Sequence, residues 1–137
     1  MVALILNSGL GSRMGTYTND HPKCMTELMH GETILSRQLC ILEKFGIKSV
    51  IITTGYYNDI LMNYCLSLGL ELDYKFIYNP RYAETNYIYS IYCARDYLID
   101  QDILMLHGDL VFEGSVIHDI LKYEKSCMKV SSSTQLP

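Results

Sequence analysis

The stretch VALILNSGLGSRMG, residues 2–15, decides how the rest of the sequence is interpreted. Val2 to Leu6 is a continuous apolar run, which is typical of a parallel strand covered on both faces. A glycine-rich turn that carries Arg13 follows at once. The dinucleotide pattern G-x-G-x-x-G would need a glycine where the chain has Met14, and the Gly-Lys-Ser/Thr triplet of a P-loop does not occur. The turn therefore matches neither of these two nucleotide-binding motifs.

Length and composition predict one globular domain, residues 1–137, with 49% hydrophobic residues. The formal net charge of −4 argues against nucleic acid as a partner, because nucleic-acid-binding domains usually carry a basic stripe. No apolar run approaches the ~20 residues of a transmembrane helix. The run VALIL is too short for the core of a signal peptide and lacks a basic flank, so we expect no membrane association.

The five cysteines indicate a reducing compartment, and the cytoplasm is the expected location. They include no C-x-x-C pair, and an odd number does not suit a closed set of disulfides. Cys24 follows Lys23, but one cationic neighbour is weak support for a nucleophile.

Strand and helix patterns alternate along the chain. Apolar residues recur at helical spacing in four segments: 34–45, 60–68, 86–98 and 114–123. Three further runs favour strands: 49–54, 72–78 and 102–107. The alternation predicts an α/β fold with three αβα layers, Rossmann-like, in which helices cover both faces of an open, mainly parallel sheet. The tail at 129–137 has at most the start of a last strand.

The turn after the opening strand holds the first candidate functional residues, because ligands of such folds bind beyond the carboxyl ends of the strands. Gly9 and Gly11 let the backbone approach a ligand closely, and successive N–H groups in such a turn bind anions. Arg13 adds a cationic fork that suits phosphate oxygens. These residues predict a phosphate site, and the alternative is a tight turn with a solvated arginine.

Two further candidates follow the same rule of position. Lys23 ends the loop that holds Arg13, and Pro22 restricts its backbone. Asp109 follows Gly108 at the end of the segment 102–107, where a carboxylate that faces phosphates is a natural Mg²⁺ ligand. The alternatives are a solvated surface lysine and an aspartate that caps a turn.

Together these groups resemble the nucleotidyltransferases that activate sugar phosphates and related phosphate esters. The resemblance rests on four stretches: LNSGLGSRMG (6–15), HPKCMTEL (21–28), GETILSRQLCILEKFGI (31–47) and LMLHGD (104–109). The segment YNPRYAETNYIYSIYCA (78–94) is most similar to the bacterial phosphocholine cytidylyltransferase branch.

The resemblance implies transfer of a nucleoside monophosphate from a nucleoside triphosphate, with CTP favoured, to phosphocholine or a sugar 1-phosphate, with release of pyrophosphate. It implies catalytic roles for Arg13 and Lys23, the latter on the α-phosphate, and a Mg²⁺ cofactor on Asp109. Residues 9–13 would hold the β- and γ-phosphates. The nucleotide-binding residues would be Leu6, Asn7, Ser8, Gly9, Leu10, Gly11, Ser12, Arg13, Lys23, Asn79 and Asn86, with the base near the last two.

The chain also departs from the family. Asn7 and Ser8 stand where members usually have two alanines, and members are considerably longer. We therefore expect a fragment or a shortened relative, catalytically poor, that self-associates through the strand 103–106. A non-catalytic nucleotide-binding module is the main alternative.

Other classes fit less well. A glycosyltransferase would need an Asp-x-Asp motif, which the residues after Asp109 do not complete. A dinucleotide-dependent oxidoreductase fails at Met14 and lacks a well-placed acid at the end of the strand 49–54. Tyr87, Tyr89 and Tyr92 would suit a quaternary ammonium such as choline, although packing of the helix against the sheet is the favoured explanation.

Overall fold

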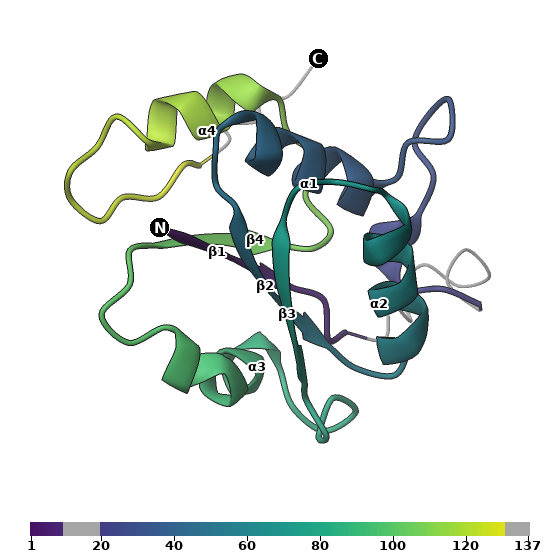
Figure 1. The fold of residues 1–137 in the computed structure, drawn as a ribbon. Coiled ribbons are helices and arrows are strands. Elements are labelled where there is room, and N and C mark those ends of the chain that lie inside the picture. Colours follow the sequence, from purple (N-terminus) through teal and green to yellow (C-terminus); the bar gives the residue numbers. More distant parts are fainter. Residues whose placement is uncertain (10–19, 131–137) are drawn as a thin grey trace, which may run out of the picture.

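Four parallel strands form the sheet of this computed structural model, which describes residues 1–9 and 20–130 (Figure 1). They are β1 (Val2–Leu6), β2 (Ser49–Thr54), β3 (Asp73–Tyr78) and β4 (Ile103–His107). Their order in the sheet is β3-β2-β1-β4, and every pairing is parallel. The central strand β1 is apolar throughout, and its neighbour β2 has the apolar run Val50–Ile52, because both faces of these strands are covered.

Helices cover both faces of this sheet, as Figure 1 shows. One face packs against α1 (Ile34–Lys44), α2 (Asn58–Ser67) and α4 (Gly114–Ile120), and these elements share one apolar cluster with β1, β2 and β4. The opposite face packs against α3 (Tyr87–Ala94), with Ala94 buried among residues of β1 and β2. Two short 3₁₀ helices, η2 (Lys23–Met25) and η3 (Arg95–Tyr97), complete the described elements. The predicted three-layer α/β fold is therefore confirmed.

Helix α1 shows how local sequence sets the element bounds. Thr33 and Ser36 form a capping box, in which each side chain accepts a hydrogen bond from the backbone N–H of the other. Gly46 follows the helix with φ of +75°, a left-handed conformation that glycine adopts without a steric penalty. The helix thus begins and ends where the sequence pattern predicts.

Three predicted segments differ from the structure. The helix predicted over 86–98 begins one residue later, because Asn86 lies outside α3 and caps it. It is also divided into α3 and η3, because its last turn tightens into a 3₁₀ helix. The helix predicted over 114–123 ends at Ile120. Lys129 and Val130 lie in no strand, and residues 131–137 lie outside the described residues.

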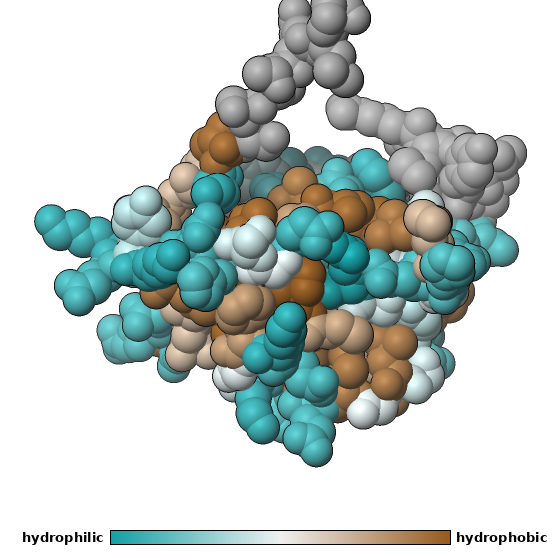
Figure 2. Space-filling view, turned by 90° about the horizontal axis from the view of Figure 1, so that it is seen from above, coloured by the Kyte–Doolittle hydropathy of each residue, from teal (hydrophilic) through white to brown (hydrophobic). Residues whose placement is uncertain are grey.

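The edge strand β4 is covered on one face only. Leu104 and Leu106 are buried against the α1 side, whereas Ile103 and Met105 on the other face are 43% and 47% exposed. This exposure arises because α3 packs on the other three strands of the sheet. Figure 2, a view from the side on which α1 and α4 lie, also shows hydrophobic residues at the surface between hydrophilic ones. In the described part of the chain, no helix is both long and apolar enough for a membrane span.

Candidate functional site

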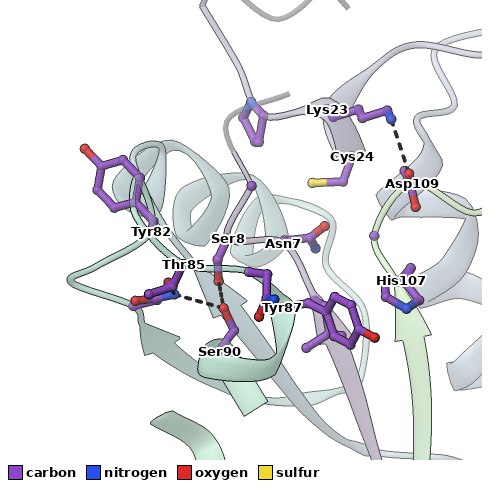
Figure 3. A pocket seen from close by; sticks show the side chains of 16 residues that line it. Asn7, Ser8, Lys23, Cys24, Tyr82, Thr85, Tyr87, Ser90, His107 and Asp109 are labelled. Carbon is purple, nitrogen blue, oxygen red and sulfur yellow. Dashed lines mark hydrogen bonds and ion pairs between the residues drawn. The ribbon is translucent and has the colours of Figure 1, made fainter. Parts of the chain in front are cut away.

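A pocket of about 270 Å³ lies beyond the carboxyl ends of β1 and β4, where ligands of this kind of sheet bind (Figure 3). Its walls come from four places in the sequence: the end of β1, the turn at η2, the segment from Asn79 into α3, and the end of β4. The sheet brings these segments together because its parallel strands end at the same edge.

The pocket gathers every predicted site residue that the structure describes. These are Leu6, Asn7, Ser8, Gly9, Lys23, Asn79, Asn86 and Asp109. The other predicted residues, Leu10, Gly11, Ser12 and Arg13, lie outside the described residues. The sequence therefore predicted one shared location for residues up to 103 positions apart, whereas the roles given to them remain predictions.

Lys23 and Asp109 form an ion pair at this pocket (Figure 3). The Lys23 Nζ atom lies 3.2 Å from Asp109 Oδ2, and the two side chains are 35% and 48% exposed. The lysine comes from η2, directly after Pro22, whereas the aspartate follows β4. A cation and an anion, each accessible to a ligand, are thus held side by side.

The turn that carries Asp109 is tied closely to the end of β1. Gly108 N donates a hydrogen bond to Leu6 O at 3.1 Å. A Cβ atom at position 108 would lie 2.8 Å from the same Leu6 O and would also meet the Asn7 side chain. Glycine is therefore required for this close approach of the two strand ends.

A buried hydrogen-bond network joins β1 to the opposite wall of the pocket. Ser90 Oγ donates to Ser8 Oγ at 2.9 Å, and Asn79 Nδ2 donates to Ser90 Oγ and Thr85 Oγ1, both at 3.1 Å. Asn79 Oδ1 accepts from Arg81 N at 2.8 Å. Asn79 is only 1% exposed, so its side chain supports the wall of the pocket and has no free donor for a nucleotide base.

The start of α3 forms the rest of that wall. Asn86 Oδ1 accepts a hydrogen bond from Ile88 N and so caps the helix. The Tyr87 ring packs edge-on against the His107 ring, with centroids 5.0 Å apart, and both residues line the pocket. This pair closes the side of the pocket between α3 and β4.

Sequence reasoning missed Tyr82, Thr85, Ser90 and His107 as lining residues. The signal for His107 was available, because it is the last residue of β4 and lies two positions before Asp109. Ser90 lies one helical turn after Asn86, so the helical period alone would have placed both on one face. Tyr82 and Thr85 belong to an irregular loop, and no pattern points to them.

The one thiol among the described pocket residues is not activated as a nucleophile. Cys24 lines the pocket, but the thiol is 1% exposed, and burial raises its pKa well above the ordinary value. A thiol that stays protonated is a poor nucleophile. The arrangement thus favours chemistry by positioning and charge neutralisation.

The donor set fits a metal ion that binds together with phosphates. Within residues 1–9 and 20–130, no cluster of three or more His, Cys, Asp or Glu side chains is placed to hold a metal. Mg²⁺ is commonly bound by one or two carboxylates, with phosphate oxygens and waters as the remaining ligands. Asp109 alone meets that requirement when a triphosphate supplies the other oxygens.

Known proteins are similar to this chain in sequence and fold. The chain is 33% identical over 126 residues to CTP:phosphoglutamine cytidylyltransferase of Campylobacter jejuni, an alignment that covers 88% of this chain and 48% of that protein. It is 36% identical over 110 residues to choline-phosphate cytidylyltransferase of Haemophilus influenzae, with 77% and 45% covered. The solved structure of CTP:phosphocholine cytidylyltransferase from Streptococcus pneumoniae matches with a TM-score of 0.64 at 25% identity, over 80% of this chain and 50% of that one.

These alignments confirm the resemblance that the motifs predicted, and the chain spans about half the length of these relatives. The model of the MobA-like NTP transferase domain matches residues 3–130, which include the whole described pocket. The chain therefore belongs to the MobA-like NTP transferase domain family.

Proposed function

We propose that the pocket binds a nucleoside triphosphate, preferably CTP, and that its nucleoside monophosphate part is transferred to a phosphate ester with release of pyrophosphate. The observation that carries this proposal is the meeting of Lys23 and Asp109 at the carboxyl edge of the sheet, beside the backbone of Ser8 and Gly9. A cation for phosphate and a carboxylate for a metal ion are the two groups that such a transfer needs at one place.

Each group has a distinct task in the proposed reaction. The Lys23 ammonium neutralises the α-phosphate, and Arg13 with the backbone of residues 9–13 holds the β- and γ-phosphates. Asp109 holds Mg²⁺, which neutralises phosphate charge when it is bound. An oxygen of the acceptor's phosphate attacks the α-phosphorus, the bond from that phosphorus to the bridging oxygen breaks, and pyrophosphate leaves in line. No protein nucleophile takes part, in agreement with the burial of Cys24.

The preference for CTP rests on the relatives, whose names specify CTP or choline phosphate. We assign the base to the backbone of Leu6 to Gly9 and to the exposed Asn86. We assign Asn79 to the support of the wall, because the chain itself engages both polar atoms of its side chain.

The acceptor class follows from the same relatives, which act on phosphoglutamine and phosphocholine. Of the three tyrosines singled out in the sequence, Tyr87 lines the pocket and is positioned to contact an acceptor. Tyr89 and Tyr92 pack with Arg81 and Arg95, whose guanidinium carbons lie 5.5 and 4.0 Å from the respective ring centroids. Packing therefore explains those two residues better than recognition of choline.

Calorimetric titration with CTP, UTP, ATP and GTP, each with and without Mg²⁺, tests the proposal. We expect CTP to bind most tightly and Mg²⁺ to strengthen its binding. A screen of phosphorylated acceptors for pyrophosphate release then separates the enzyme from the alternative, a nucleotide-binding module, which would bind CTP and release none. A protein that binds no triphosphate contradicts both.

A further inference from the structure

We propose that Gln38 of helix α1 is a positioning residue for Asp109, and this inference rests on the proposed function of the pocket. Gln38 is 1% exposed and does not line the pocket. Its Nε2 atom donates hydrogen bonds to His107 O at 3.0 Å and to Leu110 O at 2.8 Å, residues 69 and 72 positions later in the chain. These two carbonyls flank Gly108 and Asp109.

The two hydrogen bonds determine how the turn presents Asp109. The turn is closed by its own backbone, since Leu110 N donates to His107 O at 3.2 Å. Gln38 additionally links the turn to the core, because α1 is packed against the sheet through Leu35, Leu39 and Leu42. With both carbonyls held by one amide, the backbone between them is held against the core, and the Asp109 carboxylate projects toward Lys23.

The orientation of the amide supports this role. Nε2 faces the two carbonyls, although this leaves Gln38 Oε1 buried without a hydrogen-bond partner among the described residues. A buried acceptor without a partner is unfavourable, so the contact with the turn outweighs it. An apolar side chain would fill this site in the core without that penalty and would leave the turn unsupported.

A second contact from the same helix holds the chain further along. Arg37 Nε donates to Phe112 O at 3.0 Å, and Arg37 Nη2 lies 2.9 Å from Glu113 Oε1. Two neighbouring residues of α1, Arg37 and Gln38, therefore hydrogen-bond successive parts of the segment from β4 to α4. Of these two, Gln38 bonds the carbonyls on either side of Asp109.

Replacement of the amide tests the inference by the Mg²⁺ dependence of CTP binding. Gln38→Met has a similar length but no donor. We expect the Mg²⁺ concentration at half-maximal enhancement of CTP binding to rise about 10-fold or more, the usual effect of losing a partner that orients a metal ligand. CTP affinity without Mg²⁺ should rise by no more than it does in Asp109→Asn, because Gln38 acts through Asp109 alone.

Three comparisons make the test specific. Leu39→Val truncates the core on the same helix and should leave the Mg²⁺ midpoint as in the wild type. Gln38→Met added to Asp109→Asn should cause no further change in CTP affinity without Mg²⁺, as expected when one residue acts through the other. Gln38→Asn keeps an amide that is too short for both carbonyls, gives an intermediate midpoint, and serves if Gln38→Met does not fold.

The outcomes separate this inference from the proposed function. If the wild type shows Mg²⁺-dependent CTP binding and Gln38→Met or Gln38→Asn has the same Mg²⁺ midpoint, only the role of Gln38 is overturned and the proposed function stands. An equal rise in Leu39→Val also overturns it, since general loss of stability would then explain the effect. A wild type that binds no CTP overturns both.

Discussion

Asp109→Asn should strengthen CTP binding in the absence of Mg²⁺, although it removes the proposed metal ligand. The Asp109 carboxylate lies 3.2 Å from Lys23 Nζ and so engages the cation that we assign to the α-phosphate. It also places a negative charge beside an incoming triphosphate. The asparagine releases Lys23 and removes that repulsion, whereas Mg²⁺ no longer enhances binding because its carboxylate is gone.

The exposure of the pair sets the size of this effect. Ion pairs between exposed side chains contribute about 0.2–1 kcal/mol. The two side chains here are 35% and 48% exposed, so solvent screening keeps the pair within that range. A free energy of this size corresponds to an affinity gain of about 1.4- to 5-fold, and added salt should reduce the gain.

Isothermal titration of CTP, once in EDTA and once in Mg²⁺, measures both parts of the prediction. Asp119→Asn is the matched control, because Asp119 lies on α4 outside the pocket and its Oδ2 atom is 3.3 Å from Lys129 Nζ. It makes the same change in net charge and should leave both affinities unchanged. Equal or weaker CTP binding in EDTA by Asp109→Asn would refute the reasoning, as would an equal gain in the control.

Three further predictions concern the pocket and the sheet edge. Lys23→Ala should weaken CTP binding about 10- to 100-fold, since hydrogen bonds to charged groups contribute about 1.5–3 kcal/mol. The same substitution should barely change the thermal midpoint of unfolding. Unaltered CTP affinity in calorimetry would argue against the role of Lys23. Gly108→Ala should lower the free energy of unfolding in urea by about 1–3 kcal/mol, because the new Cβ lies 2.8 Å from a backbone oxygen. Its control, Gly9→Ala, meets no described atom within 4 Å, and an equal loss in both variants would exclude the steric cause. The protein should form a dimer or a larger species in light scattering, since the edge strand β4 exposes apolar side chains; Met105→Lys should shift it toward monomer, and a wild-type monomer at every concentration contradicts this prediction.

Periodicity was sufficient to predict the layers of the fold. The apolar runs of β1 and β2 are continuous because helices cover both faces of the sheet, and Gly46 stops α1 because its φ is positive. The rule that ligands bind beyond the strand ends then placed Lys23 and Asp109 together, since parallel strands end at one edge.

Side-chain partners could not be predicted in the same way. Asn79 has a side-chain amide that could bind a nucleotide base. Its amide nitrogen instead donates hydrogen bonds to Ser90 and Thr85, which only the packing of α3 brings near. Gln38 lies in a helix whose apolar period explains its burial, but its hydrogen bonds depend on a turn formed 69 to 72 positions later. Such contacts between distant segments leave no periodic signal in the sequence.

A crystal structure of the protein with Mg²⁺ and a non-hydrolysable CTP analogue tests the central claim most directly. The account predicts the triphosphate in the described pocket, with Lys23 Nζ within hydrogen-bond distance of an α-phosphate oxygen and the metal ion on the Asp109 carboxylate. The Lys23–Asp109 ion pair should then be open, each partner facing the ligand in place of the other. A nucleotide bound outside this pocket, or a metal ion away from Asp109, would contradict the account.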